Sequence, residues 1–514
     1  MRSSTLPILF LSPFIVASQD GTLDPSFNGS GTRVNDLSFY DDRASAVVVQ
    51  PDGAIVAAGW TDDGVTTTVA LQRLLPDGTP DPAFGVGGTV LSPLAGHQRY
   101  AYDVALQSTG AIVLAGLDYD INLDGNALLM RYTADGELDS DFGVGGVVSS
   151  DLGGGAAFQS AWAVEVMDDD RIVIVGERGE DGVMCARFSA EGELDTDFGV
   201  NGVALTGISF GSGLAVALQD DGAILAGGYR IAGKGSDWLI ARFRADGSLD
   251  AGFGDAGVAI VDVGGGDVEI LKSLSICSDG RIAACGYKGS TGTDYAPVVA
   301  LLNTDGTLDE GFDADGIRAF PYSAPQWGQA HRIIAQADGT LLVSGFRVEP
   351  GESENNDFFL MRLLPDGSFD PTFAGDGRVH TDLTGAQDRA YGMAIDAEDR
   401  IVLAGHGSGQ QQAFAYARYT NTIGSGLNTT PHEESLSVFP VPSLGTIQIN
   451  GLKENSTLMD IMQSDGRVIL QERISPPFKV ELPATLSNGH YLLQFVQEGH
   501  RVTLPIVLSR NTPW

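Results

Sequence analysis

The chain has 514 residues, of which 43% are hydrophobic and 68 are glycine, and its formal net charge at pH 7 is −37. This length and apolar content are enough for two or more domains with real cores, and so many glycines favour tight turns over long helices. The strong negative charge repels nucleic acid and anionic membranes, which excludes nucleic acid as a partner.

Residues 1–18 have the pattern of a signal peptide. One basic residue, Arg2, precedes an apolar run, and small residues ending at Ser18 offer a cleavage site. No later stretch reaches the roughly 18 apolar residues that a membrane-spanning helix needs. We therefore expect a protein that leaves the cytoplasm and is secreted or held at the cell surface.

Residues 19–420 repeat one pattern seven times, at a spacing of about 57 residues. Each copy has an aspartate three residues before a phenylalanine, and the seven phenylalanines are Phe27, Phe84, Phe142, Phe198, Phe253, Phe312 and Phe373. A unit of this length cannot bury its own apolar face, so neighbouring units must stack to build a core.

The second copy contains four short apolar segments separated by turn residues, at 87–94, 101–107, 111–118 and 126–133. Their lengths and alternation are typical of strands, and no segment shows sustained helical periodicity. Seven units of four antiparallel strands predict an all-β, seven-bladed β-propeller. The last copy lacks the segment Leu-Asp-x-x-Phe, whereas the chain begins with a spare one at 23–27, which we expect to dock beside the last blade and close the ring.

A polar linker, residues 421–435, follows the repeats. The last part of the chain, residues 436–514, alternates short strand patterns with turns. This pattern predicts a small C-terminal β-sandwich as a separate domain.

The repeat resembles the delta-60 repeat family of bacterial β-propeller-like proteins. The stretch RYTADGELDSDFGVGG at 131–146 is similar to the motif of that family, in which Arg-Tyr is followed by Asp-Gly-x-Leu-Asp-x-x-Phe-Gly. The resemblance covers residues 21 to about 420. It implies the propeller fold and no particular activity, since the family has no common assigned chemistry.

The C-terminal domain resembles the type A sorting domain of the type IX secretion system of Bacteroidota. The residues that carry this resemblance are Phe-Pro-Val-Pro at 439–442, Gly445, Asp-Gly at 465–466, Gly-His-Tyr at 489–491 and the final β-run to Leu508. It implies that the outer-membrane type IX machinery is a partner and that the domain is removed after export. The exported protein is then released or attached at the surface.

An arginine recurs above the aspartate of most copies, as in Arg73 above Asp81. A catalytic site needs a singular arrangement, so we interpret this recurring pair as structural. The fifth copy has Leu301 in place of the arginine above Asp309.

Functional residues of a repeat fold are expected where the copies differ. In each copy, the residue after the glycine of the third segment is predicted to face a partner across the hairpin. The predicted pairs are Trp60/Ser45, Leu117/Tyr102, Glu177/Trp162, Tyr229/Leu214, Tyr287/Lys272, Phe346/His331 and His406/Tyr391. One position further on, four consecutive copies supply the basic residues Arg178, Arg230, Lys288 and Arg347.

Aromatic rings combined with basic groups suit a polysaccharide, and in particular an anionic one. The candidate ligand-binding residues are Trp60, Trp162, Tyr229, Tyr287, His331, Phe346, Tyr391, His406 and the four basic residues. The alternative is that the aromatic residues wedge between blades and the basic residues pair with loop carboxylates.

One loop of the second copy places Asp118, Asp120, Asn122 and Asp124 at alternate positions before a glycine. Oxygen ligands at this spacing are typical of calcium loops, although Leu128 stands where a closing carboxylate would help. The alternative is a solvated acidic turn, and no other cofactor is expected. We expect Cys185, Cys277 and Cys285 to be buried free thiols.

The sequence contains no HExxH or GxSxG motif and no cysteine and histidine cluster with metal-ligand spacing. We therefore expect a non-enzymatic binding or adhesion protein for glycan or protein. The alternative is an extracellular polysaccharide lyase or glycoside hydrolase. For that chemistry, His331, His406, Tyr391 and the basic residues are the plausible suppliers of a base and a cation.

Overall fold

The computed structural model describes residues 20–421 except 39, 93–96, 120–123, 154–157, 265–266, 291–294, 321–326, 349–354 and 410, together with the strands between 437 and 508. The chain divides into two compact units, Met1–Gly426 and Leu427–Trp514. The predicted signal peptide and the predicted linker, except Asn421, lie outside the described residues.

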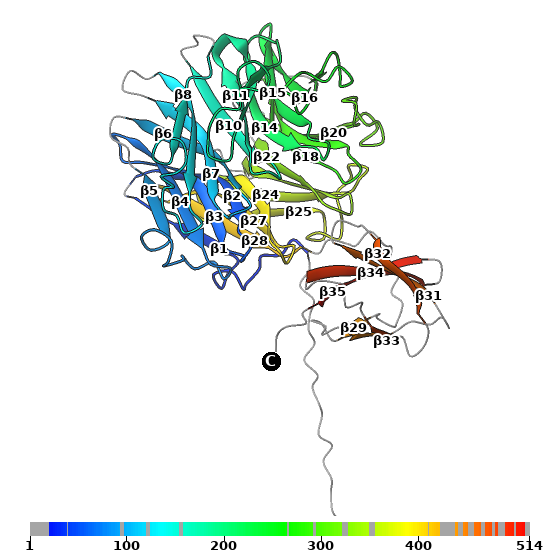
Figure 1. Cartoon of the computed structure of the whole chain (residues 1–514). Coiled ribbons are helices and arrows are strands. Elements are labelled where there is room, and N and C mark those ends of the chain that lie inside the picture. Colours follow the sequence, from blue (N-terminus) through cyan, green and yellow to red (C-terminus); the bar gives the residue numbers. More distant parts are fainter. Residues whose placement is uncertain are drawn as a thin grey trace, which may run out of the picture. The chain divides into compact units, whose positions relative to one another are not determined.

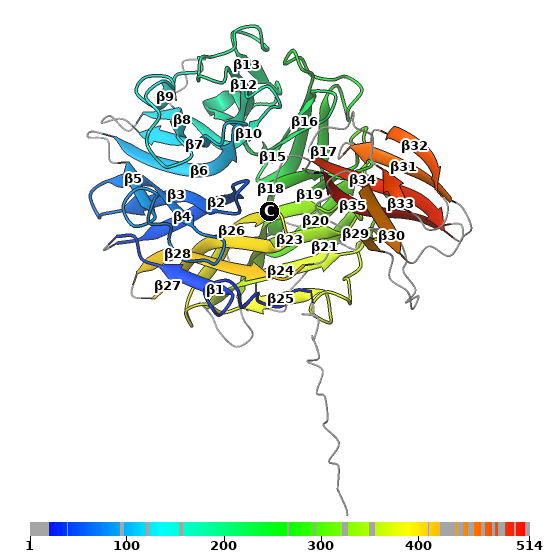
Figure 2. The ribbon, with the colours of Figure 1, turned by 60° about the horizontal axis from the view of Figure 1, so that its bottom comes forward.

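The first unit is the predicted seven-bladed β-propeller, and every blade is a four-stranded antiparallel sheet (Figures 1 and 2). Blades 1 to 3 are β2 (Asp42–Val49), β3 (Ile55–Asp62), β4 (Thr67–Leu74), β5 (Thr89–Ser92); β6 (Gln98–Leu106), β7 (Ile112–Tyr119), β8 (Gly125–Tyr132), β9 (Val147–Ser150); and β10 (Gln159–Val166), β11 (Ile172–Arg178), β12 (Val183–Phe188), β13 (Val203–Leu205).

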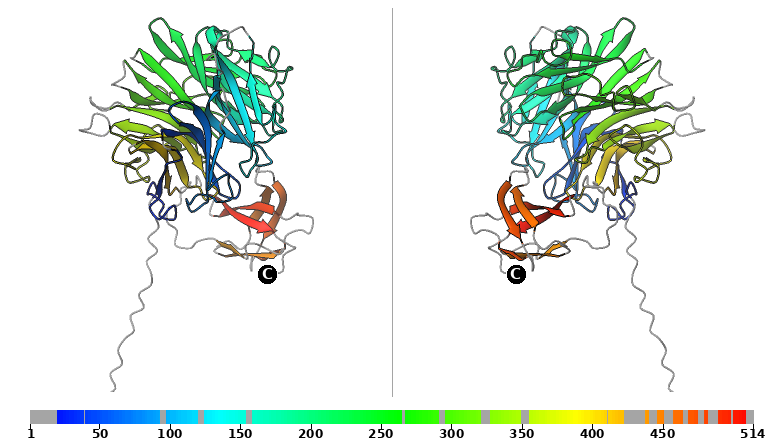
Figure 3. Two further views of the ribbon diagram at one scale, coloured as in Figure 1. Left: turned by 90° about the vertical axis from the view of Figure 1, so that its left-hand side faces the viewer. Right: turned by 90° about the vertical axis from the view of Figure 1, so that its right-hand side faces the viewer.

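Blades 4 to 6 are β14 (Gly211–Leu218), β15 (Ile224–Ala232), β16 (Gly235–Phe243), β17 (Val258–Val261); β18 (Val268–Ile276), β19 (Ile282–Gly289), β20 (Ala296–Leu302), β21 (Ile317–Ala319); and β22 (Gly328–Ala335), β23 (Leu341–Val348), β24 (Asn356–Leu363), β25 (Arg378–Thr381). Blade 7 is β26 (Asp388–Ile395), β27 (Ile401–Ser408), β28 (Gln412–Tyr419) and β1 (Thr32–Asn35). The side views in Figure 3 show how the blades fan around the ring.

The predicted grouping of strands into units was wrong by one strand. The segment predicted as the first strand of the second unit contains β5, which pairs with β4 and is the outermost strand of blade 1. The segment predicted as the fourth strand overlaps β8, the third strand of blade 2. The sequence repeat and the blade are therefore out of phase, because the Asp-x-x-Phe turn links the third and fourth strands within one sheet.

This offset explains how the ring closes. β1 comes from the amino-terminal end of the propeller and pairs with β28 from its carboxy-terminal end, along Thr32 to Asn35. Leu23 also forms a bridge to Tyr419, and the Asp24 amide donates to the Arg418 carbonyl at 2.8 Å. The prediction that residues 23–27 close the ring is confirmed.

The recurring arginine and aspartate form the predicted structural pair, with nitrogen to oxygen distances of 2.6–2.8 Å in five blades: Arg73–Asp81, Arg131–Asp139, Arg187–Asp195, Arg242–Asp250 and Arg362–Asp370. Each guanidinium also lies over the motif phenylalanine, as Arg73 does over Phe84 at 4.7 Å. Arg73 Nη1 donates to the Ala134 carbonyl of the next blade at 2.5 Å. The pair therefore ties neighbouring blades together.

Two blades complete this arrangement in other ways. In blade 7, the aspartate and the phenylalanine come from the amino-terminal segment. Arg418 Nε lies 2.9 Å from Asp24 Oδ2, and the Arg418 guanidinium lies 4.9 Å from the centroid of the Phe27 ring. In blade 5, where Leu301 replaces the arginine, Arg281 Nη1 reaches the Asp309 carboxylate at 2.6 Å. The pairing is thus retained even where the sequence motif is broken.

The core lies between the blades. Phe84 is fully buried and packs with Val56 and Leu71 of blade 1 and with Ile112 and Leu114 of blade 2. The other six motif phenylalanines are equally buried. No single blade buries its own apolar face, as the length of the repeat predicts.

The second unit contains a three-stranded sheet, β29 (Ser437–Phe439), β30 (Thr446–Asn450) and β33 (Lys479–Glu481), and a four-stranded sheet. The strands of the latter are β32 (Val468–Ile474), β31 (Thr457–Gln463), β34 (Gly489–Gln497) and β35 (His500–Leu508). The β-sandwich and its role as a sorting domain stay predictions.

All three cysteines are buried and unpaired, as predicted. Among the described residues the single helix is the short 3₁₀ turn η1 (Gly179–Asp181). None of the described helical structure is long and apolar enough to cross a membrane.

Candidate functional site: a ring of bulge residues in the propeller channel

The inner strand of every blade contains a β-bulge at the same position. In blade 1 the register shifts between Ala44 and Ala46, so Ser45 is the extra residue, and the other six blades repeat this shift. A bulge leaves one residue outside the ladder and redirects its side chain. The seven bulged residues are Ser45, Tyr102, Trp162, Leu214, Lys272, His331 and Tyr391.

A glycine on the second strand makes each bulge possible. A Cβ added at Gly59 would lie 1.9 Å from the Arg43 carbonyl oxygen, and a Cβ at Gly176 would lie 1.8 Å from the Ser160 oxygen. Equivalent approaches of 1.8–2.0 Å occur in the other five blades, at Gly116, Gly228, Gly286, Gly345 and Gly405. The glycine that ends each apolar segment of the sequence is therefore required by the bulge opposite it.

The bulge also corrects the predicted hairpin pairs. Trp60 faces Arg43 and not Ser45, and the other observed partners are Leu117/Tyr100, Glu177/Ser160, Tyr229/Ser212, Tyr287/Ile270, Phe346/Gln329 and His406/Arg389. The observed partner of Trp60 is thus two residues away from the predicted one. The first residue of this difference arises in the hairpin loop, which is centred on Asp52, as the pairing of Val49 with Ile55 shows, and not between Asp52 and Gly53. The other comes from the bulge.

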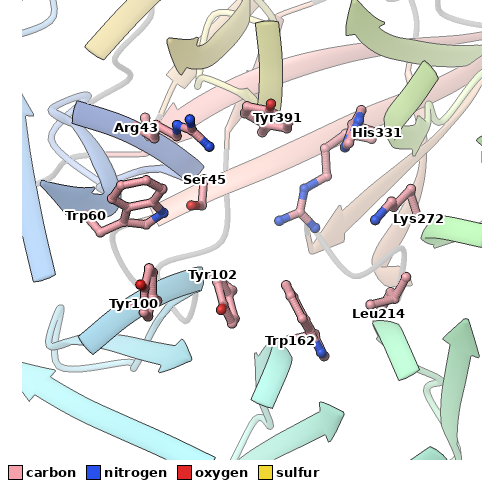
Figure 4. Close-up of a pocket in the computed structure, with 12 residues that line it drawn as sticks. Arg43, Ser45, Trp60, Tyr100, Tyr102, Trp162, Leu214, Lys272, His331 and Tyr391 are labelled. Carbon is pink, nitrogen blue, oxygen red and sulfur yellow. The ribbon is translucent and has the colours of Figure 1, made fainter. Parts of the chain in front are cut away.

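The seven bulged residues meet in the channel of the propeller, where they line a cavity of about 360 Å³ (Figure 4). The cavity is also lined by Arg43, Ala44, Trp60, Tyr100 and Arg332. Tyr102 and Trp162 stack with ring centroids 4.0 Å apart and an interplanar angle of 11°, and the His331 ring lies 4.9 Å from that of Tyr391. Figure 4 shows the nitrogen ends of Arg43 and Lys272 pointing toward the middle of the cavity.

The cations of this cavity are incompletely neutralised. Arg43 donates to the Gln412 amide oxygen and lies 4.9 Å over the Trp60 ring. Among the described residues, no carboxylate lies within 4.0 Å of the Lys272 ammonium, and none lines the cavity. Burial lowers the pKa of Lys272 to about 8, so the side chain is still mostly charged at pH 7.

His331, in contrast to Lys272, is uncharged. Burial lowers its pKa well below the usual range, and the nearby charges of Lys272, Arg332 and Arg389 lower it further. The imidazole is therefore neutral at pH 7. One ring nitrogen, Nε2, lies 3.2 Å from Gln329 Oε1, and the ring stacks on Phe346 at 5.4 Å.

Four of the predicted ligand-binding residues line the cavity: Trp60, Trp162, His331 and Tyr391. Phe346 and His406 lie behind them and are only 2% and 1% exposed. Tyr229 and Tyr287, half-buried on β15 and β19, are not among the lining residues. The sequence prediction thus found part of the site and part of the layer that supports it.

The predicted basic arc does not reach the cavity. Arg178 pairs with Asp181 at 2.9 Å, Arg230 pairs with Asp237 at 2.8 Å, and Lys288 Nζ donates to the Val263 carbonyl at 2.6 Å. Arg347 lines a separate surface cavity beside Phe369. Arg178 and Arg230 therefore fit the alternative interpretation, in which the basic residues pair with carboxylates, whereas Lys288 bonds to a backbone carbonyl between blades 4 and 5.

The candidate calcium loop is only partly described, because Asp120 and Asn122 lie outside the described residues. Asp118 is 1% exposed and accepts hydrogen bonds from Arg99 at 3.0 and 3.2 Å and from His97 Nδ1 at 2.9 Å. A carboxylate held by a guanidinium is a poor ligand for a cation. Asp118 is therefore better explained as the partner of Arg99.

Sequence reasoning missed Arg43, Tyr100, Arg332 and Asp103, and it named Lys272 only as a hairpin partner. A signal for Lys272, Asp103 and Arg332 is present. In every blade the bulged residue stands fourteen positions before the glycine, and in four blades the residue after it lines a second cavity of about 430 Å³ deeper in the channel. At that deeper position five blades have Ala46, Ala163, Ala215, Ser273 or Gly392, while two have Asp103 and Arg332.

Solved structures with a similar fold are distant in sequence. The polysaccharide lyase Uly1 is 12% identical with a TM-score of 0.44, over 75% of this chain and 91% of its own. The gluconolactonase XC5397 from Xanthomonas campestris is 12% identical with a TM-score of 0.34, over 76% and 99%. The apo form of the soluble aldose sugar dehydrogenase from Escherichia coli is 11% identical with a TM-score of 0.33, over 75% and 98%. At these values the three structures carry no information about the activity of this chain.

No curated protein sequence matches the chain. Five segments match the family model described as a domain of unknown function (DUF5122) β-propeller, at residues 50–84, 107–142, 219–253, 277–312 and 336–373. Each matched segment falls in a different blade and ends at the motif phenylalanine. These matches support the membership of the chain in a β-propeller repeat family.

Proposed function

We propose that the protein is an exported, non-enzymatic binding protein that holds an acidic saccharide in the central cavity of its propeller. One observation carries this proposal. In a chain with 67 acidic and 30 basic residues, the described lining of the cavity has Arg43, Lys272 and Arg332 and no carboxylate. Positive charge collected in a concave site of an acidic protein points to an anionic ligand.

The aromatic residues of the cavity favour a sugar as the body of that ligand. Trp60, Trp162, Tyr102 and Tyr391 present rings to the cavity, and aromatic faces combine apolar area with polar edges. A carboxylated or sulfated saccharide offers flat apolar ring faces for these side chains and an anion for the cations. An acidic protein surface is the other ligand that an adhesion protein could bind, and failure to bind every oligosaccharide of the array below would favour it.

The test is a glycan array that carries acidic and neutral oligosaccharides, followed by calorimetric titration of each hit. Lys272→Met is expected to weaken binding of an acidic saccharide by about tenfold or more, because a charge-assisted hydrogen bond contributes about 1.5–3 kcal/mol. Lys234→Met is the matched control, because Lys234 is exposed at a hairpin tip outside the cavity lining. Equal loss in both variants, or equal binding of neutral and acidic sugars, would contradict the proposal.

A polysaccharide lyase is the second candidate, and the packing of His331 against Tyr391 favours it. A neutral imidazole next to a phenol, with Lys272 nearby, contains the base, the acid and the cation that abstraction of a proton beside a uronate carboxylate needs. The assay is the appearance of the unsaturated uronate product in ultraviolet absorbance. Product formation that His331→Ala abolishes would replace the binding function with catalysis.

Export is part of the proposal and rests on residues 1–18 and on the resemblance of the tail to a sorting domain. Fusion of residues 431–514 to a fluorescent protein, in a host that has type IX secretion, is expected to send the fusion to the cell surface. Retention of the fusion in the periplasm would contradict this export route. The saccharide binding of the propeller would be unaffected by that result.

A further inference from the structure

The deeper layer of the channel contains one ion pair that crosses it. Arg332 Nη2 lies 2.5 Å from Asp103 Oδ1, and Asp103 Oδ2 accepts a hydrogen bond from the Val164 amide at 3.1 Å. Arg332 belongs to blade 6 and Asp103 to blade 2, which are three blades apart in a ring of seven. No two blades of such a ring are further apart, so the pair spans the channel.

The five other blades leave room for this pair. At the same depth they have alanine, serine or glycine, at Ala46, Ala163, Ala215, Ser273 and Gly392. None of these five residues has a side chain long enough to reach across the channel, and the two long side chains meet across it. The pair lies between two cavities: Arg332 lines the upper cavity of about 360 Å³ and also the lower one of about 430 Å³, which Asp103 lines as well.

The two cavities differ in charge. The upper cavity has Arg43, Lys272 and Arg332 in its described lining. The lower cavity has two carboxylates, Asp103 and Glu165, and Arg332 as its single cation among the described lining residues. Arg332 and Asp103 compensate each other there, and Glu165 adds negative charge as it ionises near pH 7, so a polyanion is favoured in the upper cavity over the lower one.

We propose that the cavity binds the end of an acidic saccharide chain, with the terminal carboxylate placed on Arg332 and Lys272, and does not bind the middle of a chain. This inference rests on the proposed function and deepens it. The Arg332–Asp103 pair closes the floor, so a chain cannot pass through the ring. The upper cavity is near the small end of the range for small-molecule sites, about 300–1,000 Å³, which suits a chain end better than an extended segment.

Asp103 acts as a positioning residue in this arrangement. Asp103 holds Arg332 Nη2, which fixes the guanidinium across the channel. Because a guanidinium has five N–H donors in one plane, the other two nitrogens of Arg332 can donate to the ligand. Lys272, on the neighbouring blade 5, is one layer higher and supplies a second donor. The stacked Tyr102 and Trp162 then offer a ring face for the terminal sugar.

The test is the stoichiometry of binding of the full chain to polygalacturonate fractions, one a short oligomer and one a long polymer. End recognition gives the same number of bound proteins per chain for both lengths. Recognition of internal segments gives a number that grows with chain length, and that result would overturn the inference while leaving the proposed function intact. No binding of any acidic saccharide by the folded protein would overturn both.

Variants provide a second readout. Arg332→Gln is expected to weaken binding of the short oligomer by about tenfold to a hundredfold, as the loss of a charged hydrogen bond predicts. Arg244→Gln is the matched control, because Arg244 pairs with Asp250 on the outside of blade 4. Thermal unfolding is measured for both variants. Unchanged affinity in a folded Arg332→Gln protein would contradict the placement of the carboxylate.

Discussion

Closure of the ring by the amino-terminal segment makes a quantitative prediction about one buried ion pair. Asp24→Asn removes the charge that faces Arg418, whose side chain is 1% exposed and whose Nε lies 2.9 Å from Asp24 Oδ2. Breaking a buried pair by removing one partner costs about 3–5 kcal/mol, because the other charge stays buried without compensation. Arg418 keeps a contact with Asp396 at 4.0 Å, so we expect a loss of about 3 kcal/mol in the free energy of unfolding.

Asp309→Asn is the matched control, because Asp309 occupies the same position of the repeat in blade 5. Its partner Arg281 is 26% exposed and keeps Asp279 at 2.8 Å when Asp309 is neutralised. A partly exposed pair of this kind contributes about 1 kcal/mol or less. Asp309→Asn is therefore expected to lower the free energy of unfolding far less than Asp24→Asn, because Arg281 is partly exposed to water and blade 5 is formed from one continuous stretch of chain.

The assay is urea unfolding of the full chain followed by tryptophan fluorescence. Four of the five tryptophans lie in the propeller, so the signal reports its unfolding: Trp60, Trp162, Trp238 and Trp327. The free energy is extrapolated from the midpoint and slope of each transition. Equal losses for the two variants would refute the view that the buried pair with Asp24 fastens the ring.

Three further outcomes follow from the structure. Gly176→Ala brings a Cβ to 1.8 Å from the Ser160 oxygen and is expected to cost about 3 kcal/mol or more, while Gly409→Ala, with open space around its Cβ, should stay within about 0.5 kcal/mol in the same urea assay. Glu165 is exposed but lies inside the channel, where desolvation and then the charge of Asp103 raise its pKa from 4.5 to about 7. The native state therefore keeps a proton that the unfolded chain releases, and stability falls as the pH rises from about 4.5 to about 7; the melting temperature of Glu165→Gln should lack this fall. Burial raises the pKa of Cys277 to about 11, and all three thiols should react with a thiol reagent only when the chain unfolds.

Much of the fold could be predicted because the same sequence pattern recurs in all seven repeats. The apolar segments, the turn glycines and the buried phenylalanines recur seven times, and stacking is the physical solution for units that cannot form a core alone. The spare segment at 23–27 even predicted the closure. The grouping of strands into blades could not be read from the repeat, because a cyclic pattern has no marked beginning and the choice depends on which hydrogen bonds form within one sheet.

The site was harder to predict because it depends on small displacements of the backbone. A bulge adds one residue to a strand; together with the one-residue difference in the loop it changed the partner of Trp60 from Ser45 to Arg43, and it turned Tyr102 and Lys272 into the channel. The pairing of Asp103 with Arg332 depends on the closed ring, since the two residues are 229 positions apart in the chain. Neither strand alone contains any sign of the other.

The bulge nevertheless links the repeat to the site in a way that sequence alone can exploit. A glycine is forced opposite each bulge because the carbonyl of the inner strand occupies the space of a Cβ, so the recurring glycine marks where the inner strand departs from the regular ladder. The residue fourteen positions earlier enters the channel, and in four blades its successor lines the deeper cavity. The scaffold fixes these positions without fixing their side chains, because a bulged residue makes no ladder contacts that its neighbours require. Serine, leucine, lysine, histidine and three aromatic residues fill the upper ring of this propeller, and Asp103 and Arg332 close its floor. The chemistry of the channel is therefore set by side chains that the fold leaves free to vary.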